Sequence, residues 1–251
     1  MHSEGSRTGR PEEAVRLNRY LASCGVCSRR EADRLIEEGA VTVDGAAAVP
    51  GMLVTGREKI RVRDRVVRGQ DRKVVVAWYK PVGVTTTERD PHAKKTVGDA
   101  FSYPVRLTYA GRLDRDSEGL LLMTNDGDLI EAMMRGSAGH EKEYVVRTTA
   151  RIQDVQLSRM AEGIYLKDLG VKTRPCKVRR LGDHSFDIVL TQGLNRQIRR
   201  MCQAVGLHVQ TLKRVRVLNI TLACLRPGMQ KTIEGKDLED LYRAAGLAPR
   251  Q

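Results

Sequence analysis

The sequence YAGRLDRDSEGLLLMTNDG, residues 109–127, joins a charged loop to an apolar strand. Its second half is a continuous apolar run that ends at the turn formers Asn125, Asp126 and Gly127, and this pattern predicts a buried strand. The charged residues before the run would then stand at the edge of a rigid sheet. Such an edge is a favourable place for a reactive carboxylate such as Asp114.

Asp114 is flanked by Arg112 and Arg115, whose guanidinium groups can keep a carboxylate ionised and can also contact phosphates. An aspartate in a loop is far more often a turn former or a helix cap than a catalytic group. We interpret Asp126 in that structural way. The Asp114 loop therefore becomes a candidate site only if other parts of the sequence support it.

The composition favours a polyanionic partner. The 251 residues include 44 Lys and Arg against 31 Asp and Glu, which gives a net charge of +13 and a pI near 9.8, and this length suits one large and one small domain. Because neutralising phosphates releases counterions, a nucleic acid is the first candidate. The charge is also clustered, since residues 170–219 contain eleven basic residues and only Asp183 and Asp187 as acids. The basic residues are Lys172, Arg174, Lys177, Arg179, Arg180, Arg196, Arg199, Arg200, Lys213, Arg214 and Arg216.

Other classes of protein fit the sequence less well. No apolar run approaches the roughly 18 residues that span a bilayer, and the first residues lack the apolar segment of a signal peptide, so we expect a cytoplasmic protein that does not bind membranes. Five cysteines, an odd number, fit reduced thiols better than a disulfide framework. Cys24 and Cys27 have the spacing of half a zinc site, but the sequence offers no second pair. We interpret them as buried apolar residues and expect no metal.

The first 70 residues predict a small module. Residues 1–12 contain almost no apolar side chains and are expected to form a disordered tail. Over residues 13–70 the apolar spacing predicts two helices followed by a β-hairpin. The second helix begins with Ser28 and Glu31, which have the pattern of a capping box. Basic residues on the two helices suit phosphate binding: Arg16, Arg19, Arg29, Arg30 and Arg34.

Residues 71–251 predict a larger α+β domain. Strands are expected at 74–79, 120–124, 144–148, 186–191 and 209–222, and helices at 96–100, 128–135, 152–162 and 195–205. Strands outnumber helices and are irregularly spaced. This favours a mixed, mainly antiparallel sheet flanked by helices over a repeat of βαβ units.

Three further motifs accompany the Asp114 loop. Lys80-Pro-Val-Gly83 ends a strand with a rigid turn, and by itself it indicates only a turn. Tyr144 lies where a charged stretch enters a strand, and its ring can either stack on an extruded base or fill the core.

The third motif, QGLNRQIRRM at residues 192–201, predicts an amphipathic helix capped by Asn195, with Ile198 on its apolar face. Its basic face carries Arg196, Arg199 and Arg200. The amino-terminal end of such a helix offers free N–H groups to a phosphate. A charged helix face usually contacts only solvent, but residues 191–219 contain no acid to pair with these arginines, which favours an anionic ligand.

Together, these motifs resemble those of the RsuA/RluB/RluE/RluF family of pseudouridine synthases. The Lys80-Pro-x-Gly, Gly111-Arg-Leu-Asp, Lys142-x-Tyr and Gly193-x-Asn-Arg-Gln-Ile-Arg-Arg-Met motifs occur in the order of the family, and the RluF type, which acts on 23S rRNA, is the most similar. Residues 19–33 resemble the small RNA-binding domain first seen in the fourth ribosomal protein of the small subunit. The resemblance covers residues 15 to about 225. It implies a pseudouridine synthase fold and the isomerisation of uridine in RNA without a cofactor.

The resemblance also implies roles for individual residues. Asp114 would supply the catalytic carboxylate as a nucleophile or a base, and Tyr144 would stack on the flipped uracil. Many members have Arg or Lys in place of Leu194, and that residue pairs with the aspartate. In this chain Arg196 and Arg199 are the candidates, and the choice between them stays open. The residues expected to contact substrate RNA are Lys80, Arg112, Leu113, Arg115, Leu194, Asn195, Gln197 and Ile198 in the large domain and Arg19, Ser28, Arg29 and Arg30 in the small domain.

We expect a monomer that acts on 23S rRNA or a ribosome assembly intermediate, with tRNA or 16S rRNA as alternative targets. Two rival functions are an RNA-binding protein without catalysis and a hydrolase of the nucleosidase or glycosidase type. The first would need no Gly-Arg-Leu-Asp loop. The second would pair Asp114 with a nearby acid such as Asp116 or Glu118. Isomerisation leaves the mass of the RNA unchanged, whereas hydrolysis releases free uracil.

Overall fold

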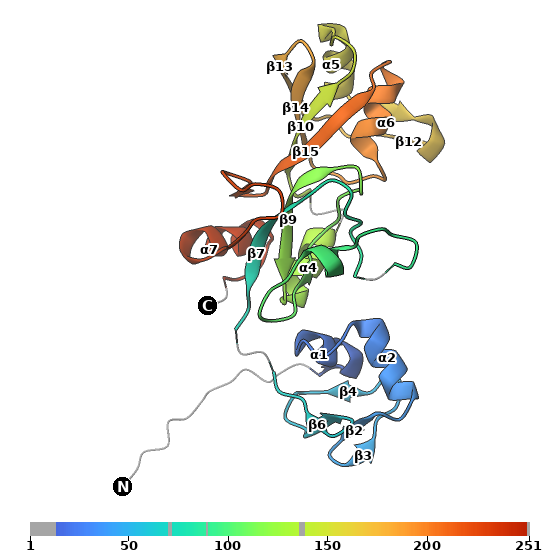
Figure 1. The fold of residues 1–251 in the computed structure, drawn as a ribbon, viewed down its shortest axis with the longest axis vertical. Coiled ribbons are helices and arrows are strands. Elements are labelled where there is room, and N and C mark those ends of the chain that lie inside the picture. Colours follow the sequence, from blue (N-terminus) through green and yellow to red (C-terminus); the bar gives the residue numbers. More distant parts are fainter. Residues whose placement is uncertain (1–13, 70–71, 89, 136–138, 250–251) are drawn as a thin grey trace. The chain divides into compact units, whose positions relative to one another are not determined.

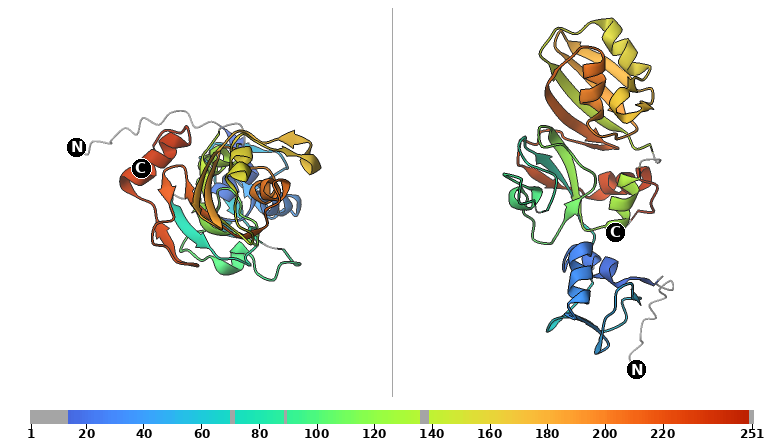
Figure 2. Two further views of the ribbon diagram at one scale, coloured as in Figure 1. Left: turned by 90° about the horizontal axis from the view of Figure 1, so that it is seen from above. Right: turned by 90° about the vertical axis from the view of Figure 1, so that its right-hand side faces the viewer.

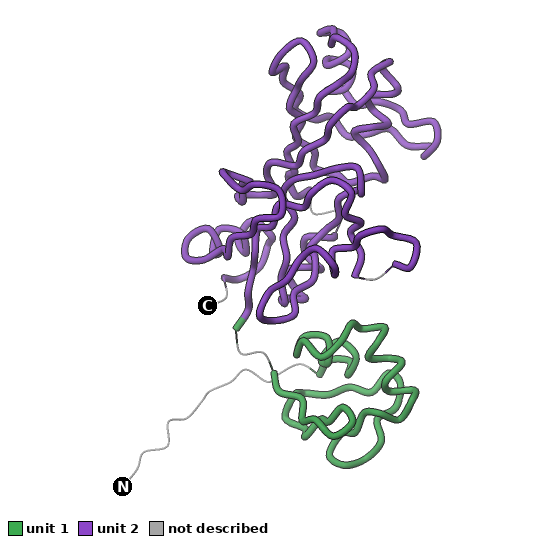
Figure 3. The backbone as a smooth tube through the Cα atoms, viewed as in Figure 1, with its two compact units in different colours: residues 1–72 green, residues 73–251 purple. Residues whose placement is uncertain are grey.

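The chain divides into two compact units, Met1–Arg72 and Lys73–Gln251 (Figure 3). The computed structural model describes residues 14–69, 72–88, 90–135 and 139–249. The tail expected at residues 1–12 lies outside this described part. Among the helices of the described residues, none is both long enough and apolar enough to cross a membrane.

The first unit packs two helices against short strands (Figure 1). The helices are α1 (Leu17–Ser23) and α2 (Arg29–Glu37). The strands β2 (Val41–Val43), β3 (Ala46–Ala47), β5 (Ile60–Val62) and β6 (Arg65–Val66) pair in the order β3-β2-β5-β6, and β1 (Val15–Arg16) pairs with β4 (Leu53–Val54). The predicted helix-helix-hairpin module is confirmed, with further short strands around it.

The second helix of this unit shows how the sequence sets local structure. Ser28 precedes α2, and its hydroxyl accepts a hydrogen bond from the backbone N–H of Glu31 at 3.2 Å. Leu35 and Ile36 are buried on the core side of the helix, whereas Arg29 and Arg30 are exposed. The amphipathic pattern therefore directs the basic side of α2 to solvent.

The second unit is built on a mixed sheet that has nine strands in the described residues (Figures 1 and 2). Seven of them follow the order β13-β14-β10-β15-β9-β7-β17, while β16 pairs with β15 and β8 pairs with β9. The strands are β7 (Val75–Lys80), β8 (Thr108–Tyr109), β9 (Glu118–Thr124), β10 (Lys142–Thr148), β13 (Lys177–Gly182), β14 (Ser185–Leu190), β15 (Val209–Val217), β16 (Ile220–Thr221) and β17 (Gln230–Thr232). Among these described strands β15 and β9 are parallel and the other pairs are antiparallel, which confirms the predicted mixed, mainly antiparallel sheet.

Helices flank this sheet in separate groups. The helices α4 (Gly127–Met134) and α7 (Gly235–Ala244) pack against β7 and β9, and the short α3 (Val97–Ala100) packs on the other face of these strands. The helices α5 (Asp154–Ala161) and α6 (Gln197–Ala204) pack against β10 and β14. After α5 in the chain, β11 (Tyr165–Leu166) pairs with β12 (Val171–Lys172), and the 3-10 turn η2 (Lys167–Leu169) connects them.

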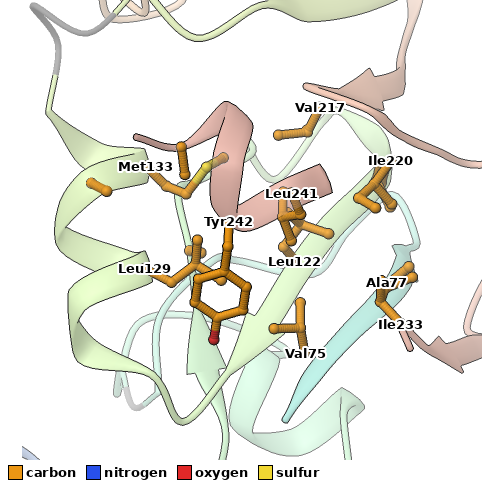
Figure 4. Close-up of a cluster of buried hydrophobic side chains, with 14 of the residues drawn as sticks. Val75, Ala77, Leu122, Leu129, Met133, Val217, Ile220, Ile233, Leu241 and Tyr242 are labelled. Atoms are coloured by element: carbon orange, nitrogen blue, oxygen red, sulfur yellow. The ribbon is translucent and has the colours of Figure 1, made fainter. Parts of the chain in front are cut away.

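The strands β7 and β9 are buried on both faces. Alternate residues of β9 point to opposite sides: Leu122 joins the core with α4 and α7, while Leu121 joins the core with α3. Figure 4 shows Leu241 and Tyr242 of α7 lying among side chains of α4 and the strands. This double burial explains why the apolar run at residues 120–123 is continuous rather than alternating.

Asp126, which the sequence indicates to be structural, has that role. Its carboxylate caps α4 by accepting the N–H of Asp128 at 3.0 Å, and its other oxygen accepts the hydroxyl proton of Tyr242 at 2.7 Å. The side chain of Asn125 accepts the N–H of Val74 at 2.8 Å. These polar groups tie the carboxyl end of β9 to α4, α7 and the start of β7.

Two predicted boundaries are wrong. The run at residues 209–222 predicts one strand, but the chain turns at Leu218, whose φ is +52°, and β15 and β16 form a hairpin. The helix expected to begin with Asn195 as its cap begins at Gln197 instead, and Arg196 occupies the capping position.

The parallel contact between β15 and β9 joins the two halves of the sheet. It spans two residue pairs, Lys213 with Glu118 and Arg214 with Gly119. Gly119 has a φ of +107°, and a Cβ atom built there would lie 2.3 Å from the carbonyl oxygen of Arg214. Only glycine allows the two backbones to approach this closely.

Replacing Gly119 by alanine should destabilise the second unit, because the added methyl group would meet backbone atoms that cannot move aside. We expect the free energy of unfolding to fall by about 2–4 kcal/mol, measured by urea denaturation followed by circular dichroism. Gly127→Ala is the matched control, since nothing lies within 4 Å of a Cβ at that position. An equal loss of stability in the two variants would contradict this reading of the junction.

Candidate active site

A buried arginine holds both ends of the loop that carries Asp114. Arg214, which is 2% exposed, donates from Nε to the carbonyl oxygen of Leu120 at 2.7 Å and from Nη1 to that of Arg112 at 3.1 Å. One acceptor precedes Asp114 in the chain and the other follows it. The loop is therefore fixed to β15, which lies in the other half of the sheet.

The turn after β7 holds the middle of the same loop. The hydroxyl of Thr86 donates to the carbonyl oxygen of Leu113 at 2.5 Å and accepts the N–H of Leu113 at 3.3 Å. The N–H of Gly83 donates to the carbonyl oxygen of Arg115 at 2.7 Å. The side chain of Leu113 is buried in the core with α3. Asp114 thus lies between two residues whose backbones are bonded to a neighbouring segment.

Lys80 supports this arrangement from inside the protein. It is fully buried, and its Nζ donates to the carbonyl oxygens of Pro81 at 2.9 Å and Val84 at 2.8 Å. Burial and the nearby charge of Arg214 lower the pKa of Lys80 to about 8, and the charge of Asp114 partly offsets them. The expectation that Lys80 contacts RNA directly is wrong, because its ammonium group is enclosed and bonded within the turn.

Two arginines from the start of α6 reach the Asp114 loop. Arg196 forms a bidentate pair with Asp116, with Nη1–Oδ1 and Nη2–Oδ2 distances of 3.1 and 2.9 Å, and its Nη1 lies 3.7 Å from Oδ2 of Asp114. Arg199 donates from Nη2 to the carbonyl oxygen of Asp116 at 2.8 Å, and its Nε lies 3.4 Å from the Asp116 carboxylate. Of the two candidates for the partner of Asp114, Arg196 is the one that reaches it.

The two carboxylates of the loop differ in their surroundings. Hydrogen bonds from Arg196 lower the pKa of Asp116 against the opposing effect of burial, and the charge of Arg199 lowers it further. The side chain of Asp114 is 35% exposed and lies near one guanidinium without a bidentate pair. Asp114 consequently has fewer arginine contacts than Asp116, although at 42% the side chain of Asp116 is slightly more exposed.

Tyr144 lies close to this loop on β10. It is opposite Arg214 of β15 in the sheet register. Its partly buried ring packs against the core that contains Leu113 and against the core that contains Ile198. The ring therefore stands at the junction of the two cores, on the side from which α6 approaches the Asp114 loop.

The start of α6 corrects several expectations. Asn195 is not the cap; the capping residue is Arg196, with a left-handed φ of +50° and no side-chain cap. Gln197 is buried and accepts the N–H of Leu194 at 3.1 Å, so it shapes the loop rather than presenting its amide to RNA. Ile198 is buried in the apolar core beneath the helix, and Leu194 is partly buried and packs against that core.

The other predicted RNA contacts occupy varied positions. Arg112 and Arg115 are exposed on either side of Asp114, and in the first unit Arg29 and Arg30 are exposed on α2, while Arg19 is partly buried on α1. Ser28 uses its hydroxyl to cap α2.

Arg214 and Thr86 were not predicted as site residues. A signal for Arg214 does exist, because it lies two residues after the apolar Leu212 on a strand and therefore points to the same buried side of the sheet. Thr86 gives no such signal, since its role depends on a contact with Leu113, a residue distant in sequence.

The arrangement disfavours a hydrolase that uses two carboxylates. A general acid needs a raised pKa, whereas the pKa of Asp116 is lowered by its arginine partners. Glu118 accepts a hydrogen bond from the hydroxyl of Tyr79 at 2.9 Å. Both acids are therefore already engaged by other side chains of the protein.

The second unit therefore presents a fixed loop with two partly exposed carboxylates beside arginines of α6. Residues 74–204 match the family model of RNA pseudouridylate synthases, and residues 15–60 match that of the S4 domain. The chain belongs to the RNA pseudouridine synthase family. The family resemblance seen in the sequence motifs is thereby confirmed.

Its relatives include named and uncharacterised members of this family. The chain is 39% identical over 234 residues to the dual-specificity RNA pseudouridine synthase RluF of Salmonella typhi, covering 92% of this chain and 80% of the relative. It is 35% identical over 230 residues to an uncharacterised RNA pseudouridine synthase of Rickettsia conorii, covering 90% of this chain and 99% of the relative. A crystal structure of a pseudouridylate synthase aligns with a TM-score of 0.67 at 26% identity, covering 90% of this chain and 99% of that one.

Family membership establishes the reaction. The enzyme converts uridine to pseudouridine in RNA: the bond between N1 and C1′ breaks, and a bond between C5 and C1′ forms. The predictions of an enzyme, of an RNA substrate and of this fold are confirmed.

Lys80 should make stability depend on pH in the alkaline range. In the folded protein its pKa is lowered to about 8 from an ordinary value of 10.5, so between these values the unfolded chain binds more protons. Stability should therefore rise with pH across this window. Lys80→Met removes the group, so wild type should gain stability relative to the variant between pH 8 and pH 10, as measured by urea denaturation. Lys142, whose pKa is also lowered to about 8, is present in both proteins and cancels. A difference between the two proteins that does not change with pH would contradict the prediction.

Proposed function

We propose that this enzyme isomerises uridine in 23S rRNA, with Asp114 as the catalytic carboxylate. The observation that carries the proposal is the placement of Asp114: its loop is bonded at both ends to Arg214, and its side chain stays partly exposed beside Arg196. A carboxylate held this firmly beside a fixed cation is preorganised for attack or for proton removal.

The reaction needs a base taken out of its stack and a carboxylate beside the ribose or the ring. Asp114 serves as a nucleophile toward the sugar or the ring, or as a base toward a ribose proton. Arg196 places a positive charge 3.7 Å from Oδ2 of Asp114. Tyr144 stacks on the flipped uracil, with the apolar core around Leu113 and Ile198 behind it.

Flanking RNA binds to basic residues around this site. Arg112 and Arg115 are exposed beside Asp114 and suit phosphates on either side of the flipped nucleotide. In the S4 domain, Arg19, Arg29 and Arg30 supply further phosphate contacts, which position the enzyme without reading sequence.

The choice of RNA rests on the relatives and on the resemblance to the RluF type. The relatives of this chain in Salmonella typhi and Escherichia coli are named dual-specificity RNA pseudouridine synthases. This favours a second target, and we assign it to tRNA, with 23S rRNA or a ribosome assembly intermediate as the first. The enzyme would act as a monomer in the cytoplasm.

Carbodiimide-dependent stops of reverse transcription should reveal the targets. In RNA from cells with and without the gene, we expect one or more stops in 23S rRNA that depend on the gene, and a further stop in tRNA. Gene-dependent stops in 16S rRNA alone would contradict the assignment.

Asp114→Asn should abolish pseudouridine formation, because an amide keeps the shape of the side chain but is neither a nucleophile nor a base. RNA affinity should stay within about threefold, since the loop and its arginines remain. The measurement combines a single-turnover assay of pseudouridine with a filter-binding assay on the same RNA. Asp183→Asn, which makes the same change at an exposed loop residue, is the control and should leave both unchanged. Wild-type turnover by Asp114→Asn would refute the catalytic role.

The S4 domain should contribute phosphate contacts that depend on salt. Replacing both Arg29 and Arg30 by glutamine should weaken RNA binding and reduce the slope of log affinity against log salt by about 1–2. Arg34→Gln is the matched control on the same helix, because Arg34 already pairs with Glu31 and Glu38. If the double variant keeps the wild-type slope, α2 does not bind the RNA backbone.

A further inference from the structure

We propose that Asp116 is a positioning residue for the reaction, because it holds Arg196 beside Asp114 without letting Arg196 occupy the Asp114 oxygens. The inference rests on the proposed catalytic role of Asp114. It assigns a separate task to each of the two acids in the loop, one reactive and one supporting.

The contacts divide Arg196 unequally between the two carboxylates. Both Nη atoms of Arg196 bond to Asp116, at 3.1 and 2.9 Å, whereas the distance from Nη1 to Oδ2 of Asp114 is 3.7 Å. The longer distance is an approach of charges without a hydrogen bond. Asp114 thus has a cation nearby, yet its oxygens stay available to substrate.

A direct bidentate pair between Arg196 and Asp114 would have the opposite effect. Bidentate arginine–carboxylate pairs are strong and occupy both carboxylate oxygens, which would have to be freed before either could react. Asp116 prevents this because it takes both donor groups itself. Its ionised form is secured by the same contacts, which lower the pKa of Asp116.

The backbone of Arg196 gives a second reason for a holding contact. Its φ of +50° is left-handed, a conformation that is strained for a residue with a side chain. Strained residues of this kind persist where their surroundings determine them. The bidentate pair with Asp116 is such a determinant, and it joins the start of α6 to a loop 80 residues earlier in the chain.

Arg199, one turn further along α6, adds to the contacts between this helix and Asp116. It is 16% exposed, donates to the carbonyl oxygen of Asp116 and approaches the Asp116 carboxylate. Asp116 therefore contacts two arginine side chains, Arg196 through its carboxylate and Arg199 through both its carboxylate and its carbonyl oxygen. Removing its charge would release Arg196 either toward Asp114 or away from the loop. Both movements slow the reaction, the first by blocking the oxygens and the second by removing the cation.

A double-mutant cycle tests whether Asp116 acts through Arg196. The variants are Asp116→Asn, Arg196→Gln and the double substitution, each assayed for the single-turnover rate constant and for RNA affinity. We expect Asp116→Asn to lower the rate constant by about tenfold with RNA affinity changed less than about threefold. In the Arg196→Gln background the same substitution should lower the rate by less than about twofold. Asp116→Glu, which retains the carboxylate, should keep more activity than Asp116→Asn.

The matched control is Asp168→Asn. Asp168 pairs with Arg200, an arginine of the same helix that lines a separate groove of about 630 Å³ among α5, β11 and α6. This change removes a carboxylate from an arginine of α6 that does not reach the Asp114 loop. It should leave the rate constant within about twofold of wild type.

Three results would overturn the proposal. They are a rate within twofold of wild type for Asp116→Asn, an equal loss in the two Arg196 backgrounds, and a loss with Asp116→Glu as large as with Asp116→Asn. Melting temperatures identify a variant that fails to fold, and Asp116→Glu then carries the comparison. If Asp114→Asn is active, the proposed function itself fails. If Asp114→Asn is inactive and Asp116 is insensitive, only the positioning role fails.

Discussion

The parallel contact between β15 and β9 is the constraint on which the rest of the catalytic unit depends. Gly119 has no side chain, so the backbone of β9 can approach Arg214 closely enough to pair. The same arginine is then buried and satisfies the carbonyl oxygens of Arg112 and Leu120. A single short junction therefore connects the two halves of the sheet and also fixes the loop that carries Asp114.

This junction explains why the proposed site draws residues from both halves of the sheet. The half built on β7 and β9 provides the Asp114 loop, while β10 and α6 of the other half provide Tyr144 and Arg196. Burying cations such as Lys80 and Arg214 beneath the loop is costly unless their donors are used. Backbone carbonyls of the loop and the turn accept hydrogen bonds from Nζ of Lys80 and from Nε and Nη1 of Arg214, whereas Nη2 of Arg214 is buried without a hydrogen-bond partner among the described residues.

Much of the fold could be predicted from the sequence, for physical reasons. Runs such as residues 120–123 indicate buried strands because burial on both faces requires continuous apolar side chains, and α2 is indicated by Ser28 and its apolar spacing. The predictions that failed concerned features that depend on contacts between residues distant in sequence. The burial of Lys80, the role of Arg214 and the left-handed cap at Arg196 arise only when β7, β15 and α6 meet. The strand pattern around Arg214 indicates that its side chain faces inward, but no local pattern shows which distant segments these residues contact.

The most direct measurement is a crystal structure of the Asp114→Asn variant bound to an RNA stem-loop that contains the target uridine. The uridine should be flipped out of its stack, with its base on the ring of Tyr144 and its C1′ beside the side chain at position 114. Arg196 should still form its bidentate pair with Asp116. A target uridine bound elsewhere, away from position 114, would contradict the central claim that this loop presents the catalytic carboxylate.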